Sequence, residues 1–566
     1  MFRSTFFDSL KTVRAQGSSL ASEHHHRRQL YGGFTMKLLS LRNSIALALL
    51  SVAVSVSAKP LVVCTEASPE GFDMVQYTTA VTADAVAETM FNRLADFKPG
   101  TTEVIPALAD SWEISDDGLT YTFHLRKGVK FHTTDYFKPT RDMNADDVLW
   151  SFQRQLDPKH PWHDKSSVGF PYFESMGFKE LLKSVEKTDD YTVKFTLTRR
   201  EAPFLADLAM AFASIYPAEY ADQLLKANKT GDLNSKPIGT GPFIFQRYAK
   251  DAQVRFKANP DYFRGKPPAD ALILAIATDN NVRLQKLKAN ECQIALYPKP
   301  DDVPSIKKDP NLKIDELEAM TTGYIAINTT HKYLSDVRVR KAIDMTFDKN
   351  AYVNAVFGKG NALVAVNPYP PTLLGYNKDL KNPPIDLDKA RALLKEAGVP
   401  EGTTFTLFTR NGGGPTNPNP MLGAQMMQSD LAKIGIKIDI RVMEWGEMLK
   451  RAKNGEHDMV SAGWAGDNGD PDNFLTPMLS CEAAKNGENY ARWCNADFQK
   501  LIDKARETVN PDERAGLYEQ AQAIFNKDQP WISMAHTRMF TAMRKNVEGY
   551  KISPLTTNNF ATTQVK

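Results

Sequence analysis

Three aspartates stand close together in the stretch GWAGDNGDPDNF, residues 463–474. Asp467, Asp470 and Asp472 could supply the acid and base of a hydrolase, the oxygen ligands of a metal ion, or a seat for a cationic ligand. The letters GDNGDPDN are also ordinary turn chemistry, in which Asp and Asn side chains accept hydrogen bonds from their own backbone. The stretch therefore leaves four interpretations open.

Motifs for catalysis or metal binding are weak elsewhere in the chain. The aspartate stretch lacks the closing Glu of a calcium loop, and no Gly-x-Ser-x-Gly motif marks a nucleophile. KPIGTGPF, residues 236–243, lacks the Gly-Lys-Ser/Thr ending of a P-loop and predicts a tight turn. NGGGP, residues 411–415, could present backbone N–H groups to an anion. We therefore expect no catalytic residue, no metal and no cofactor, and we favour a binding protein.

Alternating strands and helices position the aspartates. From about residue 320, strands are expected at 323–328, 404–409, 437–443 and 457–464, and helices at 336–347, 387–398, 422–435 and 444–455. Earlier in the chain, strands are expected at 119–131 and 191–198, and helices at 144–156, with Asn144 as N-cap, and at 203–213. This order predicts an α/β fold. The aspartate stretch follows the C-terminal end of a strand, where α/β sheets usually bind ligands.

The N-terminal residues predict export. From Met36, a basic start is followed by an apolar region at residues 45–56 and by the sequence VSA, a small-x-small cleavage site. We expect a signal peptide over residues 36–58, cleaved near Ala58, and a periplasmic mature protein. Residues 1–35 resemble no export signal, and we interpret them as a mis-called extension. Their run EHHHRR is therefore not a metal site.

Charge and cysteine content narrow the function classes further. The formal net charge of +3 gives no support for nucleic-acid binding. An even number of cysteines in an exported protein predicts two disulfides. Cys481 and Cys494 flank a short polar loop and are natural partners, which leaves Cys64 to pair with Cys292.

From residue 59 to residue 566 the chain resembles the periplasmic dipeptide-binding proteins of Gram-negative ABC importers, within the peptide/nickel-binding family 5 of bacterial solute-binding proteins. The resemblance is carried by VCTEASPEGFD, PALADSWEISDDGLTYTFHLRKGVKFH, REAPFLADLAM, PIGTGPF and EWGEMLKRAKNGEHDMVSAGWAGDNGDPDNF. It implies a two-lobed periplasmic binding protein fold of type II, with an extra small domain in lobe I and a hinge between the lobes. Lobe I would comprise residues 59–319 and 537–566, and lobe II residues 320–536. The resemblance implies the same two disulfides.

The resemblance also implies a ligand site around one of the aspartates. Asp467 matches the residue that holds the peptide's N-terminal ammonium, and a carboxylate is the group that can replace an ammonium's lost hydration. Trp464 would form a wall of the site, with Ala465 beside it, and Gly466 would let the backbone approach closely. Thr78 matches a further residue that contacts ligand. Asp470 and Asp472 would shape the loop.

The carboxylate end of the expected ligand departs from the family pattern. Relatives carry an Arg before PxNPN that pairs with the peptide carboxylate, and this chain has Gly414 there, before Pro415 and Thr416. Arg410 could reach back to the carboxylate, or the N–H groups of residues 412–414 could hold it. Alternatively, the ligand is a modified or longer peptide, or an amine without that carboxylate.

The main functional hypothesis is a monomeric receptor that captures dipeptides, or related amine-bearing small molecules, by hinge closure and delivers them to an inner-membrane permease. A receptor for haem, glutathione or another modified peptide on the same fold is the first alternative. A hydrolase that uses a pair of carboxylates is the alternative of another class.

Overall fold

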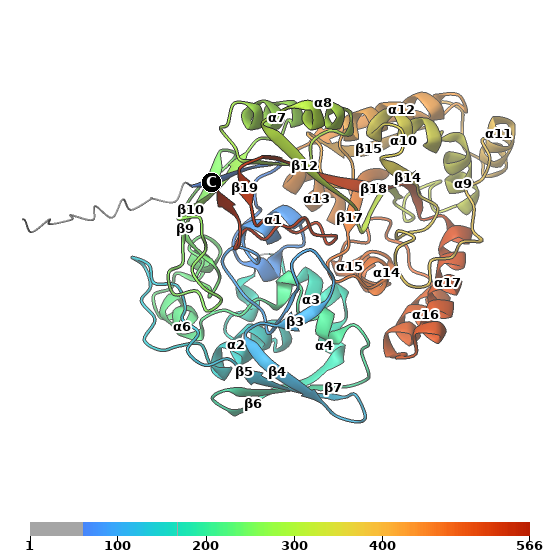
Figure 1. Cartoon of the computed structure of the whole chain (residues 1–566). Coiled ribbons are helices and arrows are strands. Elements are labelled where there is room, and N and C mark those ends of the chain that lie inside the picture. Colours follow the sequence, from blue (N-terminus) through green and yellow to red (C-terminus); the bar gives the residue numbers. More distant parts are fainter. Residues whose placement is uncertain (1–59, 167) are drawn as a thin grey trace, which may run out of the picture. The chain divides into compact units, whose positions relative to one another are not determined.

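A computed structural model describes residues 60–166 and 168–566 (Figure 1). The predicted extension over residues 1–35 and the signal peptide over residues 36–58 lie outside these described residues. Strands and helices alternate along the described chain, so the predicted α/β class is confirmed. Within the described ranges, no helix has both the length and the apolar character that crossing a membrane requires.

Twelve strands form one mixed sheet in the order β16-β15-β17-β13-β18-β11-β1-β10-β9-β8, with β12 and β14 also paired to β18. Their bounds are β1 Leu61–Thr65, β8 Phe243–Ala249, β9 Gln253–Ala258, β10 Ala271–Ile276, β11 Ile294–Leu296, β12 Leu312–Glu318, β13 Thr321–Ile327, β14 Ala362–Val364, β15 Thr404–Arg410, β16 Lys437–Met443, β17 Met459–Ala465 and β18 Trp531–Arg544. β15 is parallel to both β16 and β17, and β1 is parallel to β10 and β11. Neighbouring parallel strands therefore bring the residues that follow them to a common edge.

The long strand β18 joins two halves of this sheet. Its first part, from Trp531 to Ala535, pairs with β13, and its last part, from Arg538 to Arg544, pairs with β12. The chain therefore passes between the halves twice, once between β12 and β13 and once within β18. The predicted lobe boundaries, 319/320 and 536/537, fall at these two crossings, while the division into lobes stays a prediction.

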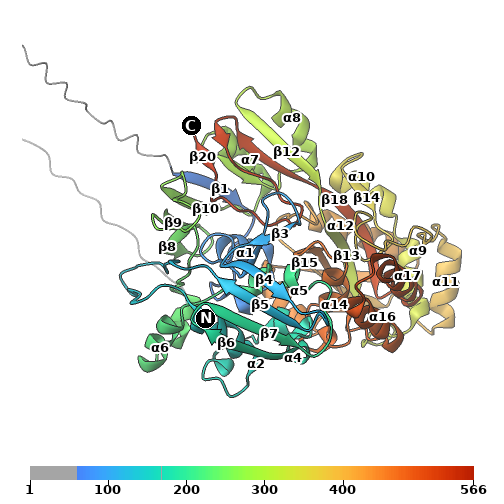
Figure 2. The same cartoon turned by 60° about the horizontal axis from the view of Figure 1, so that its bottom comes forward.

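Helices pack on both halves of the sheet (Figures 1 and 2). On the half with β15, α12 packs against β15 and β16, and α13 against β15. Ile343, Leu407 and Met427 belong to the apolar core beneath these helices. The bounds are α7 Asn280–Lys288, α8 Val303–Lys308, α9 Val337–Thr346, α10 Lys349–Phe357, α11 Leu387–Glu396, α12 Pro420–Ala432, α13 Trp445–Lys453, α14 Asp472–Leu479, α15 Ala483–Asn486, α16 Ala496–Glu507 and α17 Pro511–Asp528.

A separate four-stranded antiparallel sheet has the order β4-β5-β7-β6 and packs against α2 (Figure 2). Its alternating pattern buries Tyr121, Phe123 and Leu125 on one face of β5. Helix α2 begins with the predicted cap, because the Asn144 side chain and that of Asp147 form a capping box. The bounds are β4 Ala109–Ile114, β5 Thr120–Leu125, β6 Leu182–Asp189, β7 Thr192–Leu197, α2 Ala145–Leu156, α3 Pro171–Ser175, α4 Phe178–Leu181, α5 Phe204–Asp207 and α6 Ala218–Lys226.

Two predicted elements in this region are too long. The strand expected at residues 119–131 ends at Leu125. The helix expected at residues 203–213 is reduced to the single turn α5 and a 3₁₀ turn at Ala211–Ala213. Phe204, Leu208 and Phe212 are all buried. The apolar run in this segment therefore signals burial, which does not by itself distinguish a helix from a buried loop.

The remaining elements are short. They are α1 Ala80–Ala85, β2 Ala95–Phe97, β3 Val104–Pro106, β19 Val547–Glu548, β20 Gln564–Val565, and the 3₁₀ turns Met74–Gln76, His163–Lys165, Thr230–Asn234 and Pro300–Asp302. Both predicted disulfides are confirmed: Cys64 pairs with Cys292, with a Cα–Cα distance of 5.8 Å, and Cys481 with Cys494, at 4.6 Å. The first bond ties the start of the large sheet to the segment before β11.

Candidate functional site

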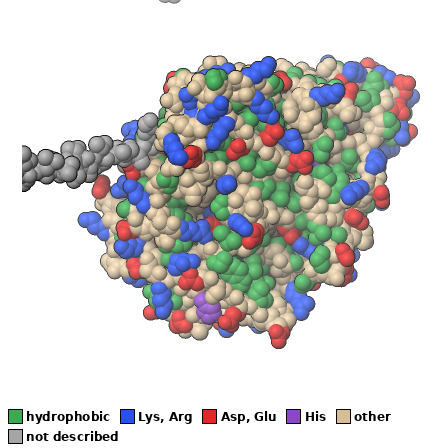
Figure 3. All heavy atoms as spheres, in the orientation of Figure 1, with side chains coloured by type: hydrophobic (Ala, Val, Ile, Leu, Met, Phe, Trp, Pro, Cys, Tyr) green, Lys and Arg blue, Asp and Glu red, His purple; other side chains and the backbone are tan. Residues whose placement is uncertain are grey.

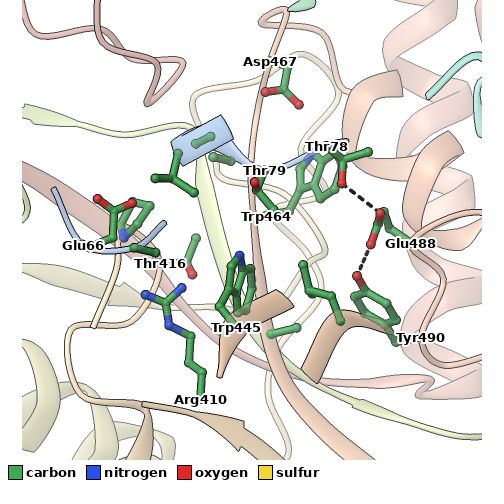
Figure 4. A pocket seen from close by; sticks show the side chains of 18 residues that line it. Glu66, Thr78, Thr79, Arg410, Thr416, Trp445, Trp464, Asp467, Glu488 and Tyr490 are labelled. Atoms are coloured by element: carbon green, nitrogen blue, oxygen red, sulfur yellow. Dashed lines mark hydrogen bonds between the residues drawn. The ribbon is translucent and has the colours of Figure 1, made fainter. Parts of the chain in front are cut away.

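A cavity lies where strands of both halves of the large sheet end (Figure 4). It is lined by Glu66 after β1, Thr78 before α1, Arg410 at the end of β15, Trp445 at the start of α13 and Trp464 near the end of β17. The cavity volume is about 90 Å³. This value is smaller than the ~300–1,000 Å³ typical of sites for drug-sized molecules. As predicted, the aspartate stretch meets a cavity at the carboxyl end of its strand.

Asp467 lies at one end of this cavity, with Ala465 in the same wall. Its backbone N–H donates to Asn473 Oδ1 over 2.8 Å, and the Trp464 indole N–H donates to the same oxygen over 3.2 Å. The Tyr172 hydroxyl donates to Asp467 Oδ2. Burial raises the pKa of Asp467 to about 7, against the hydrogen bonds from Tyr172 and Asn473. No ion pair among the described residues involves Asp467, so no basic side chain of this part of the chain neutralises its carboxyl group.

The other two aspartates of the stretch do not line the cavity. Asp470 accepts two hydrogen bonds from the Arg514 guanidinium, at 2.6 and 2.8 Å. Asp472 accepts from the Thr476 hydroxyl over 2.5 Å. The Asp470 contact ties the loop to α17, whereas the Asp472 contact lies within α14, of which Asp472 is the first residue. Neither contact involves the cavity, which agrees with the prediction that the two residues shape the loop.

Arg410 lies at the other end of the cavity (Figure 4). Because β15 and β17 are parallel, the residue that ends β15 reaches the same edge of the sheet as Asp467. Its Nε donates to Gly412 O and its Nη2 to Gly413 O, both over 3.2 Å. The guanidinium carbon lies 4.6 Å from the centre of the Trp445 ring, a cation–π contact. Burial lowers the pKa of Arg410, against the nearby Glu66 carboxylate.

Gly414 explains why Arg410 fits there. A Cβ atom at position 414 would lie 3.1 Å from Arg410 Nη2, so the guanidinium occupies the space that a side chain at Gly414 would take. The Gly414 N–H donates to Asn417 O over 2.9 Å. Gly414 is not among the residues that line the cavity, and its N–H group is not free to bind a carboxylate, so a contact of Gly414 with a ligand stays a prediction. Pro415 and Thr416, the next two residues, do line the cavity.

Gly466 is the second predicted site residue that lies outside the lining. A Cβ atom here would lie 2.8 Å from the Phe474 ring, and the Gly466 N–H donates to Met320 O over 2.7 Å. The close approach at Gly466 is therefore to the protein's own Phe474 and Met320. The predicted lining residues Thr78, Arg410, Pro415, Thr416, Trp464, Ala465 and Asp467 are all at the cavity, and their contact with a ligand stays a prediction.

A third group of lining residues was not predicted. Glu488 accepts from the Thr78 hydroxyl over 2.9 Å and from the Tyr490 hydroxyl, and it pairs with Lys453 Nζ at 2.8 Å. Glu488 is only 3% exposed. Glu488 lies in a loop that has no recognisable motif. Thr78 is 410 positions away in the chain, so no local sequence pattern predicts the contact between them. Glu66 was also missed, although it follows β1 directly and the strand-end argument could have found it.

The described residues offer no metal site, since no three His, Cys, Asp or Glu side chains among them form a suitable group. Acidic and basic side chains are interspersed over the face shown in Figure 3. The arrangement therefore places the Asp467 carboxyl group and the Arg410 guanidinium at separate ends of a cavity that Glu66 and Glu488 also line, with two tryptophans in its wall.

The family model for the bacterial extracellular solute-binding proteins, family 5 (middle), matches residues 103–486. Di/tripeptide-binding protein 4 of Pseudomonas aeruginosa is 65% identical over 523 residues, which are 92% of this chain and 98% of that protein. Among solved structures, the ABC transporter-associated periplasmic binding protein DppA of Helicobacter pylori, in complex with the peptide STSA, gives a TM-score of 0.86 at 38% identity. That match covers 89% of this chain and 98% of the other. The dipeptide binding protein of Pseudoalteromonas sp. SM9913, in complex with Met-Leu, gives a TM-score of 0.87 at 35% identity and covers 90% of this chain and 100% of the other.

Proposed function

Because this chain belongs to family 5 of the bacterial extracellular solute-binding proteins, we propose that it captures dipeptides, or related amine-bearing small molecules, for an ABC importer. The predicted fold class is correct, since the chain matches two peptide-bound binding proteins over about nine-tenths of its length. Relatives named for di- and tripeptides favour this hypothesis over the haem or glutathione alternative.

The observation that carries the proposal is the placement of Asp467 and Arg410 at separate ends of one cavity. A dipeptide at neutral pH is a zwitterion with an ammonium at one end and a carboxylate at the other. Asp467 would accept hydrogen bonds from the ammonium, and Arg410 would donate to the carboxylate. Trp464 would exclude water beside the ammonium, which strengthens the charge-assisted bond.

Arg410 is our choice among the alternatives for the carboxylate end. Its guanidinium lines the cavity and fills the space beside Gly414, whereas the Gly414 N–H is already bonded to Asn417 O. Two of its N–H groups are used by carbonyls, which orients the group and leaves other N–H groups of the fork for a ligand. The ligand carboxylate would thus meet an arginine. The resemblance places the family's arginine four positions later, where this chain has Gly414.

We further propose that the two halves of the large sheet belong to two lobes, residues 59–319 with 537–566 and residues 320–536, which close over the ligand. The chain crosses between them twice, an arrangement that suits a hinge. Contacts such as Thr78 with Glu488 would then form on closure. Export through a signal peptide cleaved near Ala58, a periplasmic location, a monomeric state and an inner-membrane ABC permease as partner are parts of the same proposal.

The hydrolase alternative has little support in the geometry. It needs two carboxylates that flank one scissile bond. Asp470 is paired with Arg514 and Asp472 with Thr476, and neither lines the cavity that Asp467 lines.

Native mass spectrometry of freshly purified mature protein, followed by calorimetry with the peptide it carries, tests the proposal. We expect a co-purifying di- or tripeptide mass that disappears on unfolding and refolding, and one-to-one binding of synthetic dipeptides to the refolded protein. Dipeptides that fail to bind, or that are cleaved during prolonged incubation, would refute it.

A further inference from the structure

The charges around the cavity are unevenly distributed. When both ligand termini are paired with the protein, the remaining charges can act on the ligand's side chains. Figure 4 shows Glu66 and Arg410 on one side and Glu488, Thr78 and Tyr490 on the other, with Asp467 at a third position. Glu66 interacts electrostatically with two guanidiniums, those of Arg410 and Arg283. That side of the cavity therefore has enough positive charge for both Glu66 and a ligand carboxylate.

The opposite side has an excess of negative charge. Lys453 Nζ pairs with Glu488 at 2.8 Å and also interacts electrostatically with the carboxyl groups of Glu70 and Glu174. Burial alone would lower the pKa of Lys453, but these carboxylates outweigh it and raise the pKa. One ammonium thus interacts with three acidic side chains, of which Glu70 has a pKa raised by burial, and a ligand cation would reduce the remaining imbalance.

The carboxylate of Glu488 has room for one more donor. It accepts from Thr78 and Lys453 through Oε1 and from Tyr490 through Oε2. A carboxylate offers about four lone-pair sites, so the three partners that the described residues provide leave one position unused. Because Glu488 lines the cavity, a donor that enters with the ligand can approach that position.

Apolar side chains belong to the same lining as this carboxylate. Val81 and Leu449 are both buried and both line the cavity. Lysine and arginine bind in such surroundings by packing their methylene stems on apolar surface while the charged head meets a polar group. The lining thus combines an acidic acceptor with apolar surface.

We infer that Glu488, Lys453 and Tyr490, with Val81 and Leu449, form an acidic side-chain subsite that selects peptides carrying a lysine or arginine side chain. This inference rests on the proposed function, since it assumes that the ligand's termini take Asp467 and Arg410. It assigns side-chain specificity to residues other than Asp467 and Arg410, which bind the two ends of the ligand.

Calorimetry with four matched dipeptides tests the subsite: Lys-Ala and norleucine-Ala, and Ala-Lys and Ala-norleucine. Norleucine has the stem of lysine without its ammonium. We expect the lysine peptide to bind at least about tenfold more tightly than its norleucine partner at the position facing Glu488, the effect of one hydrogen bond to a charged group. Equal affinities at both positions would overturn the inference, while norleucine peptides that bind would still support the proposed function. Failure of all four peptides would instead count against the proposed function itself.

Substitution of two residues of opposite charge distinguishes recognition of the lysine side chain from a purely structural role of Glu488. Glu488→Gln should abolish the lysine preference, and Lys453→Met should increase it, because the competing protein ammonium is removed. Glu447→Gln removes an exposed carboxylate on the same helix as Lys453 and should leave the preference unchanged. If Lys453→Met does not fold, the double variant with Glu488→Gln removes both members of the ion pair and should bind both peptides alike. A lysine preference that persists in Glu488→Gln would refute the assignment.

Discussion

Tyr172 and Asp467 lie 295 positions apart in the chain, yet the Tyr172 hydroxyl donates a hydrogen bond to the Asp467 carboxylate. Burial and the negative charge of Asp467 raise the pKa of Tyr172 well above its ordinary value, so the phenol keeps its proton and remains a donor. One carboxylate oxygen is thereby held by α3. If Asp467 accepts the ligand ammonium, as we propose, its ionisation state controls whether the ammonium can bind.

Ligand affinity should depend on pH through Asp467. Its pKa of about 7 means that the carboxyl is increasingly protonated below pH 7 and ionised above it. A bound ammonium requires the ionised form, so affinity is present above pH 7 and falls by about tenfold per pH unit below it. The α-amino group of the ligand loses its own proton above roughly pH 8, which sets the upper limit. Calorimetry from pH 5 to pH 9 should therefore give a narrow optimum near neutrality.

Asp467→Asn provides the control for this pH profile. The amide cannot ionise, so the acidic limb should flatten, while affinity at neutral pH should fall by about 2–5 kcal/mol, as when one partner of a buried charge pair is removed. A wild-type profile that is flat between pH 5 and pH 7 would contradict the assignment of Asp467 as the ammonium seat.

Arg410→Ala should weaken a dipeptide but spare its C-terminal amide. The guanidinium has no carboxylate to meet in the amide, so only the free peptide loses a charge-assisted bond, by about 2–5 kcal/mol. Calorimetry with one dipeptide and its amide, on both protein variants, measures the difference. Equal losses for the two ligands would show that Arg410 acts on something other than the carboxylate.

Gly414→Ala tests whether the missing side chain makes room for Arg410. The added Cβ would lie 3.1 Å from Arg410 Nη2, so the guanidinium should shift by a few tenths of an ångström and dipeptide binding should weaken. In the Arg410→Ala background the same substitution should have almost no effect, because the crowded group is gone. Dipeptide affinities of the four variants in this cycle measure the coupling, and simple additivity would reject it.

The sequence was sufficient to predict the cavity residues whose position follows from the order of strands and helices along the chain. Asp467 and Trp464 follow a recognisable strand in an α/β alternation, and such strand ends meet at one edge. The choice between Arg410 and the glycine N–H groups stayed open, because it depends on where a loop folds back over Arg410. The contact of Gly466 with Phe474 was not predicted for the same reason, since Phe474 lies on the helix that follows.

Contacts between residues far apart in the chain could not be predicted from the sequence. Glu488 becomes part of the cavity through Thr78 and Lys453, and the pairing of Thr78 with Glu488 spans 410 positions. The continuous strand β18 was not foreseen either. Each of its parts is stabilised by a different neighbour, β13 or β12, so local pattern does not indicate that one strand serves both halves of the sheet.

Arg506→Met should destabilise the protein strongly. Arg506 Nε pairs with Glu201 Oε1 at 2.6 Å, and both side chains are at most 3% exposed. Asp472 Oδ2 lies 3.6 Å from the same Nε, and Met176 O accepts from Nη2 over 2.6 Å. Without the guanidinium, two buried carboxylates lose their nearest cation, and Arg199, 3.5 Å from Glu201 and partly exposed, compensates only in part. Removal of one partner of a buried pair typically costs about 3–5 kcal/mol of unfolding free energy.

Urea unfolding followed by circular dichroism measures this loss, and a second substitution shows its origin. If the penalty comes from the uncompensated charge, adding Glu201→Gln to Arg506→Met should recover part of the stability, because the amide needs no cation. Lys98→Met is the matched surface control. It breaks the exposed pair between Lys98 and Glu103, and such pairs contribute about 0–1 kcal/mol. A double variant less stable than Arg506→Met alone would instead place the loss in packing around α16, because removing a second charge would then bring no relief.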